Sequence, residues 1–263
     1  MFPWSSIPAT ARTGIPRTDT VIRRTAFWLL LPLTAIQGLW LRRVAVRLPG
    51  AEGERSGKTG HSPRLALLAL GDSIIDGVGI ASIEDAMPVR VAHAVADRSG
   101  VEVSWELDGE SGHAVADVIG RLHALEPQRP PDLVLLSVGV NDVTGLSSKS
   151  TWRSRLGELL GLIRTRWPET RIVFAGLPPM GLFPLPPNPL KFSLGLRAGE
   201  FDRIAADLVS RDPGAVHVPT TINPSQHAFC EDGFHPSAES CNLWAVELAQ
   251  LLPVGESFHD RPN

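Results

Sequence analysis

The chain has 263 residues, of which 43% are hydrophobic and 20% are charged, and its formal net charge at pH 7 is −3. This length predicts one domain of about 200 residues with a tail, and the apolar content is sufficient for a full core. A small negative charge argues against a nucleic-acid partner. The charge is unevenly spread, because residues 1–58 hold nine Lys and Arg against three Asp and Glu, a balance of +6 that leaves −9 for the rest. A basic beginning on an acidic body favours contact with an anionic membrane surface.

The N-terminal part divides into two segments. Residues 1–24 are rich in Pro, Thr and Ser and show no helical or strand period, so we expect them to be poorly ordered. An apolar helix is predicted over 25–46, because residues 26–41 carry no charge, have Trp28 and Trp40 near their ends and are flanked by paired arginines. The run is just short of the about 20 residues that span a bilayer. Two interpretations remain open: association with a membrane surface, which favours a membrane or cell-envelope location, or a helix packed on a cytoplasmic domain.

The segment 47–63 is rich in Gly and Pro and predicts a flexible polar linker. A domain over 64–253 and a C-terminal tail over 254–263 follow. Apolar strands alternate with amphipathic helices in the domain, which predicts a parallel sheet with helices on both faces. The expected strands are 65–70, 101–107, 132–138, 171–176 and 215–218, and the expected helices are 86–99, 113–125, 151–167, 195–210 and 236–251.

The first strand ends in a serine. Six apolar residues over 65–70 are followed by Gly71-Asp72-Ser73, which indicates a buried strand that enters a tight turn. Such a serine lies at the carboxyl edge of the sheet, where open α/β folds bind ligands. Taken alone, the motif is more typical of a turn serine that caps the next helix. Three further motifs follow in chain order: Ser111-Gly112, Gly139-Val140-Asn141-Asp142 and Asp232-Gly233-Phe234-His235.

Together, the four stretches resemble the SGNH hydrolases, the GDSL-type esterases and lipases, over roughly residues 64–252. The chain departs from the family pattern at Ile74, where the family has Leu, and at Val140, where it has a second Gly. The resemblance implies an α/β, flavodoxin-like three-layer fold with a five-stranded parallel sheet in the order 2-1-3-4-5. It also implies a serine hydrolase that cleaves carboxylic esters through an acyl-enzyme.

The resemblance assigns a role to each motif residue. Ser73 would be the nucleophile, His235 its base and Asp232 the carboxylate that orients His235, since a serine hydroxyl needs a base within reach. The oxyanion hole would consist of the backbone N–H groups of Ser73 and Gly112 and the side-chain amide of Asn141. Each motif also has a purely structural interpretation. These are an ordinary Asp-Gly turn for Asp232-Gly233, a glycine at the start of a helix for Gly112 and a helix cap for Asn141.

One loop stands out as a candidate for substrate selection. Six of the residues 178–189 are proline, which makes the loop stiff and unable to pair as a strand. Its apolar side chains form a candidate wall for an acyl chain: Met180, Leu182, Phe183 and Leu185. The alternative is a loop that only covers the core.

The sequence has two cysteines and no motif for a metal or a cofactor. Cys230 and Cys241 flank the Asp-x-x-His motif, and we expect two thiols, with a disulfide as the alternative. The sequence has no separate cluster with metal-ligand spacing and no glycine-rich phosphate loop, so we expect neither a metal nor a cofactor.

The expected partner is a small-molecule or lipid ester: an aryl, short- to medium-chain acyl or lysophospholipid ester. Two alternatives use the same residues, namely removal of O-acetyl groups from a glycan and acyl transfer. A third is a non-catalytic, membrane-tethered module with a hydrolase fold.

Overall fold

The computed structural model describes residues 33–34, 36–41, 43, 46–62, 64–220 and 227–251. The predictions for residues 1–24, for the first part of the apolar helix and for the tail over 254–263 lie outside the described residues.

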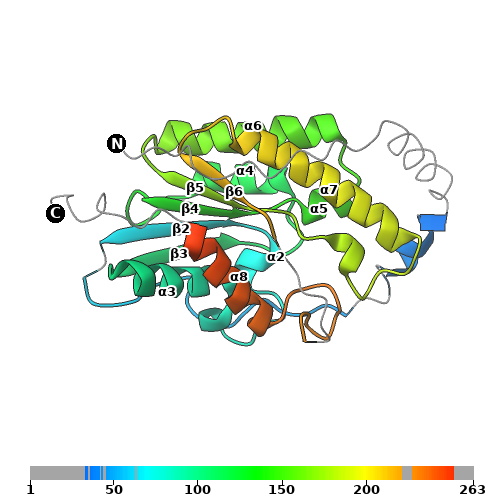
Figure 1. Ribbon diagram of the computed structural model, residues 1–263, viewed down its shortest axis with the longest axis horizontal. Coiled ribbons are helices and arrows are strands. Elements are labelled where there is room, and N and C mark those ends of the chain that lie inside the picture. The colour runs from blue at the N-terminus through cyan, green and yellow to red at the C-terminus, as the bar shows by residue number, and fades with distance from the viewer. Residues whose placement is uncertain are drawn as a thin grey trace.

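A six-stranded sheet forms the middle layer (Figure 1), in the order β1-β3-β2-β4-β5-β6. The five strands from β2 onward are parallel, and their order confirms the expected 2-1-3-4-5 arrangement. The strands are β1 (Ser56–Lys58), β2 (Leu65–Gly71), β3 (Val103–Gly109), β4 (Leu133–Ser137), β5 (Arg171–Ala175) and β6 (Ala215–Val218).

The sixth strand, β1, lies where the sequence predicts a flexible linker. It pairs antiparallel with β3 at the edge of the sheet, with Ser56 opposite Glu106. Ala51, just before it, is 4% exposed and belongs to the core. Three residues are too few for hydrophobic alternation to reveal a strand, so the sequence gives no signal for β1.

The central strand β2 is buried along its whole length, because helices cover both faces of the sheet. Leu65 and Leu67 point into the core on one face, and Leu68 and Leu70 point into the core on the other. This two-sided burial explains why its sequence is a continuous apolar run. It also fixes the end of β2, and therefore Ser73, at the carboxyl edge of the sheet.

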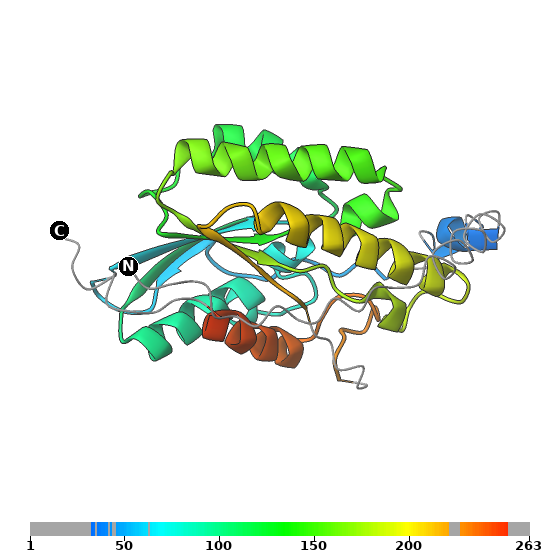
Figure 2. The same cartoon turned by 45° about the horizontal axis from the view of Figure 1, so that its top comes forward.

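Two helical layers enclose the sheet (Figure 2). One face carries α3 (Met87–Ser99) and α8 (Ala238–Leu251), which pack on each other. The other face carries α4 (Val115–Ala124), α6 (Lys149–Arg166) and α7 (Leu190–Val209). All five expected helices are present. The helix α7 begins five residues earlier than expected, because Pro189 stands at its start, where proline is compatible with a helix.

Short helical turns follow the strands at the carboxyl edge of the sheet. They are α2 (Ser73–Asp76), η2 (Ile83–Asp85), α5 (Val140–Thr144) and η3 (Met180–Leu182). The sequence does not predict them, because fewer than two turns show no period. They matter for the site, since α2 begins with Ser73 and α5 holds Asn141 in its first turn.

Within the predicted apolar helix, residues 33–34, 36–41 and 43 are helical. This segment lies against the start of α7: Gln37 Nε2 donates to the carbonyl of Asn188, and the backbone N–H of Leu190 donates to Gln37 Oε1. Among the described residues, no helix combines the length and the apolar character needed to cross a bilayer.

Candidate active site

The turn after β2 places Ser73. A side chain at Gly71 would collide with the carbonyl oxygen of Ser137, so glycine allows the ends of β2 and β4 to approach. The backbone N–H of Asp72 donates to that carbonyl over 3.1 Å, and Asp72 Oδ1 accepts from the N–H of Ile74 over 3.2 Å. Asp72 therefore caps α2, and Ser73 is its first residue.

The second part of the site is a tight turn in the chain before α8. Asp232 Oδ2 lies 2.6 Å from His235 Nδ1. The other carboxylate oxygen, Oδ1, accepts from the backbone N–H groups of Phe234 and His235 over 2.9 and 3.0 Å. Gly233 has a φ of +61°, a conformation that favours glycine. The turn thus fixes the carboxylate against the imidazole.

The charge state of Asp232 follows from these contacts. Burial by itself raises the pKa of this carboxyl group. The hydrogen bonds from the His235 side chain and from the backbone N–H groups of His235 and Phe234 outweigh that effect, and the pKa of Asp232 is lowered overall. Asp232 is therefore a carboxylate at neutral pH, and it stabilises a proton on His235 Nδ1.

Ser73 and His235 line one cavity of about 390 Å³. Its wall is mostly apolar and combines residues from α2, α5, the loops and α8: Ile74, Val140, Pro178, Phe183, Ala228, Phe234, Pro236, Leu243 and Trp244. The indole Nε1 of Trp244 is buried and has no hydrogen-bond partner. The charged residues of the described lining, apart from histidine, are both acidic: Glu239 and Glu247. The volume lies in the range of small-molecule sites.

A second His–Asp pair lies elsewhere in the structure. His217 Nε2 is 2.7 Å from Asp202 Oδ1, and the His217 ring stacks on Phe174. Neither residue lines the cavity. This pair belongs to the packing between β6 and α7, so a His–Asp contact alone does not mark the site.

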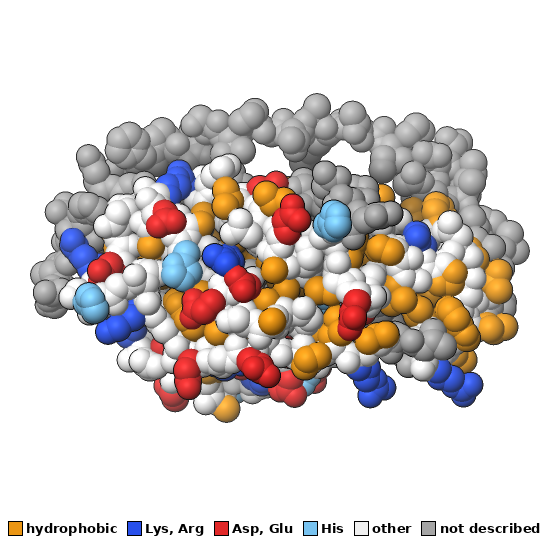
Figure 3. Space-filling model, turned by 90° about the horizontal axis from the view of Figure 1, so that it is seen from below, with side chains coloured by type: hydrophobic (Ala, Val, Ile, Leu, Met, Phe, Trp, Pro, Cys, Tyr) orange, Lys and Arg blue, Asp and Glu red, His pale blue; other side chains and the backbone are white. Residues whose placement is uncertain are grey.

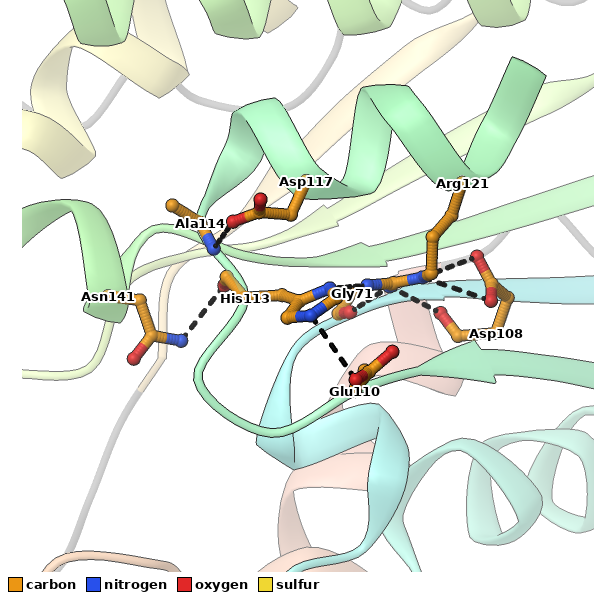
Figure 4. A network of polar contacts seen from close by, with 8 residues as sticks. All are labelled: Gly71, Asp108, Glu110, His113, Ala114, Asp117, Arg121 and Asn141. Atoms are coloured by element: carbon orange, nitrogen blue, oxygen red, sulfur yellow. Dashed lines mark hydrogen bonds and ion pairs between the residues drawn. The ribbon is translucent and has the colours of Figure 1, made fainter. Parts of the chain in front are cut away.

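The expected oxyanion residues Gly112 and Asn141 lie close to each other. Gly112 has a φ of +86° in the exposed loop between β3 and α4. Asn141 Nδ2 donates to the backbone carbonyl of His113, the next residue in that loop, over 2.9 Å (Figure 4). Neither residue is part of the described cavity lining, but Val140, next to Asn141, is.

Arg121 on α4 ties this loop to the end of β2, and no motif in the sequence reveals it. Its Nη2 donates to the carbonyl of Gly71 over 2.6 Å, and its Nε lies 3.1 and 3.2 Å from the two carboxylate oxygens of Asp108. Its Nη1 contacts His113 Nδ1 (Figure 4). One guanidinium group thus connects the end of β2, two residues before Ser73, with the loop that contains Gly112.

Two buried carboxyl groups support the same region. Asp142 Oδ2 accepts from the backbone N–H of Val115 over 2.9 Å, which fixes the start of α4 against α5. Burial raises the pKa of Asp142, and burial raises the pKa of Asp72 to about 7. Through these contacts with the N–H groups of Ile74 and Val115, both residues brace the turns of the site.

The proline-rich loop reaches the cavity through Phe183. This side chain lines the cavity and packs edge-on against Phe234, with ring centroids 5.0 Å apart. The other three residues predicted for an acyl-chain wall are not among the lining residues of this cavity. Met180 is fully buried in the core at the start of η3, Leu182 is 46% exposed, and the backbone N–H of Leu185 donates to the Gly233 carbonyl over 3.2 Å.

Both cysteines are free thiols near the Asp-x-x-His turn. Each Sγ lies within hydrogen-bond distance of the carbonyl of Pro236, at 3.3 Å for Cys230 and 4.0 Å for Cys241. Burial raises the pKa of Cys230 to about 11 and that of Cys241 to about 12, so neither forms a thiolate nucleophile near neutral pH. In the part of the chain that the structure describes, no group of three His, Cys, Asp or Glu side chains is arranged to hold a metal.

Known proteins resemble the chain in both sequence and fold. A GDSL-like esterase, Rv1075c of Mycobacterium tuberculosis, is 28% identical over 194 residues, which cover 71% of this chain and 61% of that protein. The lipase Lip_vut3 from a goat rumen metagenome has a similar fold, with a TM-score of 0.60 and 18% identity over 73% of this chain and 100% of the lipase. A family 3 carbohydrate esterase of Clostridium thermocellum has a TM-score of 0.56 at 15% identity, over 71% of this chain and 94% of its own.

The sequence model of one family covers most of the domain. Residues 69–240 match the GDSL-like Lipase/Acylhydrolase family, and this stretch contains Ser73, Gly112, Asn141, Asp232 and His235. The chain belongs to the GDSL-like lipase/acylhydrolase family.

Proposed function

We propose that the protein is a carboxylic ester hydrolase that uses Ser73, His235 and Asp232 as a catalytic triad. The observation that carries the proposal is the 2.6 Å contact between Asp232 Oδ2 and His235 Nδ1, in a turn whose histidine lines the same cavity as Ser73. Family membership supports the reaction type. The two thiols and the second His–Asp pair do not line this cavity and offer no competing nucleophile and base there.

The proposed reaction has two halves. His235 Nε2 takes the proton from Ser73 Oγ as this oxygen attacks the ester carbonyl, and it then gives the proton to the leaving alcohol. Water, activated by the same nitrogen, hydrolyses the acyl-enzyme and regenerates Ser73. Asp232 holds the proton on Nδ1 throughout and stabilises the imidazolium that forms in each half.

The developing negative charge on the carbonyl oxygen requires neutral donors. In the proposal these are the backbone N–H groups of Ser73 and Gly112 and the side chain of Asn141. The amide of Asn141 has two N–H groups. One donates to the His113 carbonyl, which orients the amide and leaves the other for the substrate.

The lining of the cavity supports an apolar ester as substrate. Aromatic and aliphatic side chains dominate the wall, and the carboxylate of Glu239 repels an anionic group. We therefore propose aryl or short- to medium-chain acyl esters that carry no negative charge near the ester.

The test is a series of p-nitrophenyl esters from acetate to palmitate, with a hemisuccinate ester as the anionic partner of butyrate. We expect kcat/KM to peak at an intermediate chain length and to be lower for the hemisuccinate than for butyrate. Ser73→Ala should leave only the low residual hydrolysis that an oxyanion hole provides without the nucleophile. Activity of Ser73→Ala equal to that of the parent would overturn the mechanism.

The same series separates the alternatives. A glycan O-deacetylase should act on acetate alone and prefer acetylated sugars, and an acyltransferase should form a new ester when an alcohol is added. A non-catalytic module should leave every ester intact.

A further inference from the structure

One end of the molecule exposes large hydrophobic side chains from the helical residues 33–34, 36–41 and 43. Leu33, Ile36, Leu39 and Trp40 are 48%, 65%, 63% and 54% exposed. The segment is attached to the domain through the two hydrogen bonds of Gln37, and Leu41 packs against the core. Its other side is therefore an apolar surface that this domain leaves uncovered.

A second segment adds to the same surface. Leu182 on η3 is 46% exposed and Phe192 in the first turn of α7 is 44% exposed. Phe192 lies two residues after Leu190, which contacts Gln37, and η3 with Leu182 packs against α7. Figure 3 shows hydrophobic side chains gathered at the right end of the molecule, the end where Figure 1 places residues 33–43 and the start of α7. We call this surface the apolar end: Leu33, Ile36, Leu39, Trp40, Leu182 and Phe192.

The sequence next to the apolar end carries cations. Residues 25–51 contain Arg42, Arg43 and Arg47 and no Asp or Glu, and residues 172–199 contain Lys191 and Arg197 and no Asp or Glu. Of the described cations, Arg43 and Arg47 are exposed and Lys191 is partly exposed, whereas Arg197 donates to the carbonyls of Val143 and Ser147. Arg43, Arg47 and Lys191 thus add positive charge beside the hydrophobic side chains, although the whole chain has a net charge of −3. Monomeric soluble proteins rarely expose such a patch without an interaction partner.

The composition identifies the partner. A helix that lies in a membrane interface has an exposed apolar side with Trp, Phe and Leu and neighbouring Lys and Arg, which attract anionic headgroups. A protein partner would not require cations alone around the patch. We propose that the apolar end docks on an anionic lipid surface, with residues 33–43 lying in the headgroup region.

This docking would place the cavity near the lipid. Phe183, the residue after Leu182, lines the cavity that holds Ser73. The docking proposal does not depend on the proposed hydrolysis, because lipid binding is measured without turnover of an ester.

The experiment measures sedimentation of the full-length protein with vesicles. One set contains phosphatidylcholine alone, and the other contains three parts phosphatidylcholine to one part phosphatidylglycerol. We expect binding to the anionic vesicles, weaker binding to the neutral ones, and release by high salt.

Two sets of variants test the two segments separately. The double variant Ile36→Ser/Trp40→Ser and the single variant Phe192→Ser should each weaken binding, the double variant by about tenfold or more, because buried apolar area is lost. Lys191→Gln should weaken binding to the anionic vesicles only. The matched control is Val246→Ser, which removes a side chain of 41% exposure from α8, outside both segments, and should bind like the parent.

Three results would overturn the proposal. The first is no binding to either vesicle set, and the second is binding that the double variant retains. The third is a dimer in size-exclusion chromatography without lipid that Ile36→Ser/Trp40→Ser converts to a monomer, which would make the apolar end a contact between two copies. Hydrolysis of a water-soluble ester by each variant at the parent rate shows that a loss of binding is not a loss of fold.

Discussion

Asn141 donates a hydrogen bond from its side-chain amide to the backbone carbonyl of His113, over 2.9 Å. This bond joins the turn after β4 to the loop after β3, two segments that are 28 residues apart in the chain. Gly112, next to His113, is thereby held beside Asn141. The two proposed oxyanion donors are thus positioned relative to each other before any substrate binds.

The first prediction follows from this bond. Asn141→Ala removes a donor that acts mainly in the transition state, so kcat should fall by about 10²–10³ while KM changes little. Steady-state kinetics on a soluble ester measure both constants. A raised KM with an unchanged kcat would assign Asn141 to substrate binding instead.

Arg121 leads to the second prediction, as a positioning residue. Arg121→Met should lower kcat with little change in KM, because the loop with Gly112 loses its connection to Gly71 and Asp108. Arg121→Lys should recover only part of the loss, since an ammonium group cannot replace the planar contacts to both partners.

The matched control for Arg121 is Arg166 on α6. Its guanidinium group also donates to backbone carbonyls, those of Leu122 and Leu125, at the far end of α4 from the loop. Arg166→Met should lower the melting temperature and leave kcat unchanged. Equal effects of the two substitutions on kcat would show that Arg121 only stabilises the fold.

The two His–Asp pairs allow a third, internally controlled prediction. Asp232→Asn keeps an oxygen that accepts from the N–H groups of Phe234 and His235, but it disfavours the tautomer with the proton on Nδ1. We expect kcat to fall by about 10⁴ with the fold retained.

Asp202→Asn is the comparison, because Asp202 accepts from the backbone N–H of Leu177 and contacts His217. It should lower stability and leave kcat within about twofold of the parent, since neither residue reaches the cavity. A loss of kcat in Asp202→Asn as large as in Asp232→Asn would contradict the assignment of the base.

The fourth prediction concerns pH and Asp72. Burial raises the pKa of Asp72 to about 7 from its ordinary 3.8, so the folded chain keeps a proton that the unfolded chain loses near pH 4. The free energy of unfolding should therefore fall as the pH rises from about 4 to 7, by at most about 1.4 kcal/mol for each pH unit.

Asp72→Asn cannot titrate, yet its side-chain oxygen still accepts from the N–H of Ile74. Urea unfolding at several pH values should show a smaller decline for Asp72→Asn than for the parent over this window. Parallel curves for the two proteins would show that Asp72 is not protonated in the folded state.

The sequence predicts the parts of the fold that are long and periodic. The run over 65–70 identifies β2 because both faces of that strand are buried, and the helices are recognised by their amphipathic period. The candidate site residues are predicted from four motifs in a fixed order. The motifs do not reveal what supports the loop that contains Gly112, however. Arg121 is one arginine among many in the sequence, and only the packing of α4 brings it to Gly71 and His113.

Short or irregular segments account for the differences between the predicted and the observed structure. Nothing in residues 56–58 distinguishes an edge strand from a linker until β3 is in place to pair with it. Met180, Leu182 and Phe183 have similar side chains, but the turn η3 directs one into the core, one outward and one into the cavity. Side-chain direction in a non-repetitive loop has no period, so composition alone does not reveal it.

The role of Ser73 as nucleophile is tested most directly by covalent labelling with a fluorophosphonate, which reacts preferentially with a serine activated by a base. We expect one label per chain, located on Ser73 by mass spectrometry of the peptides. We also expect no label in Ser73→Ala and a strongly reduced rate in Asp232→Asn, with Asp202→Asn labelled at the parent rate. A label on any other serine, or an active ester hydrolase that the probe leaves unmodified, would contradict this role.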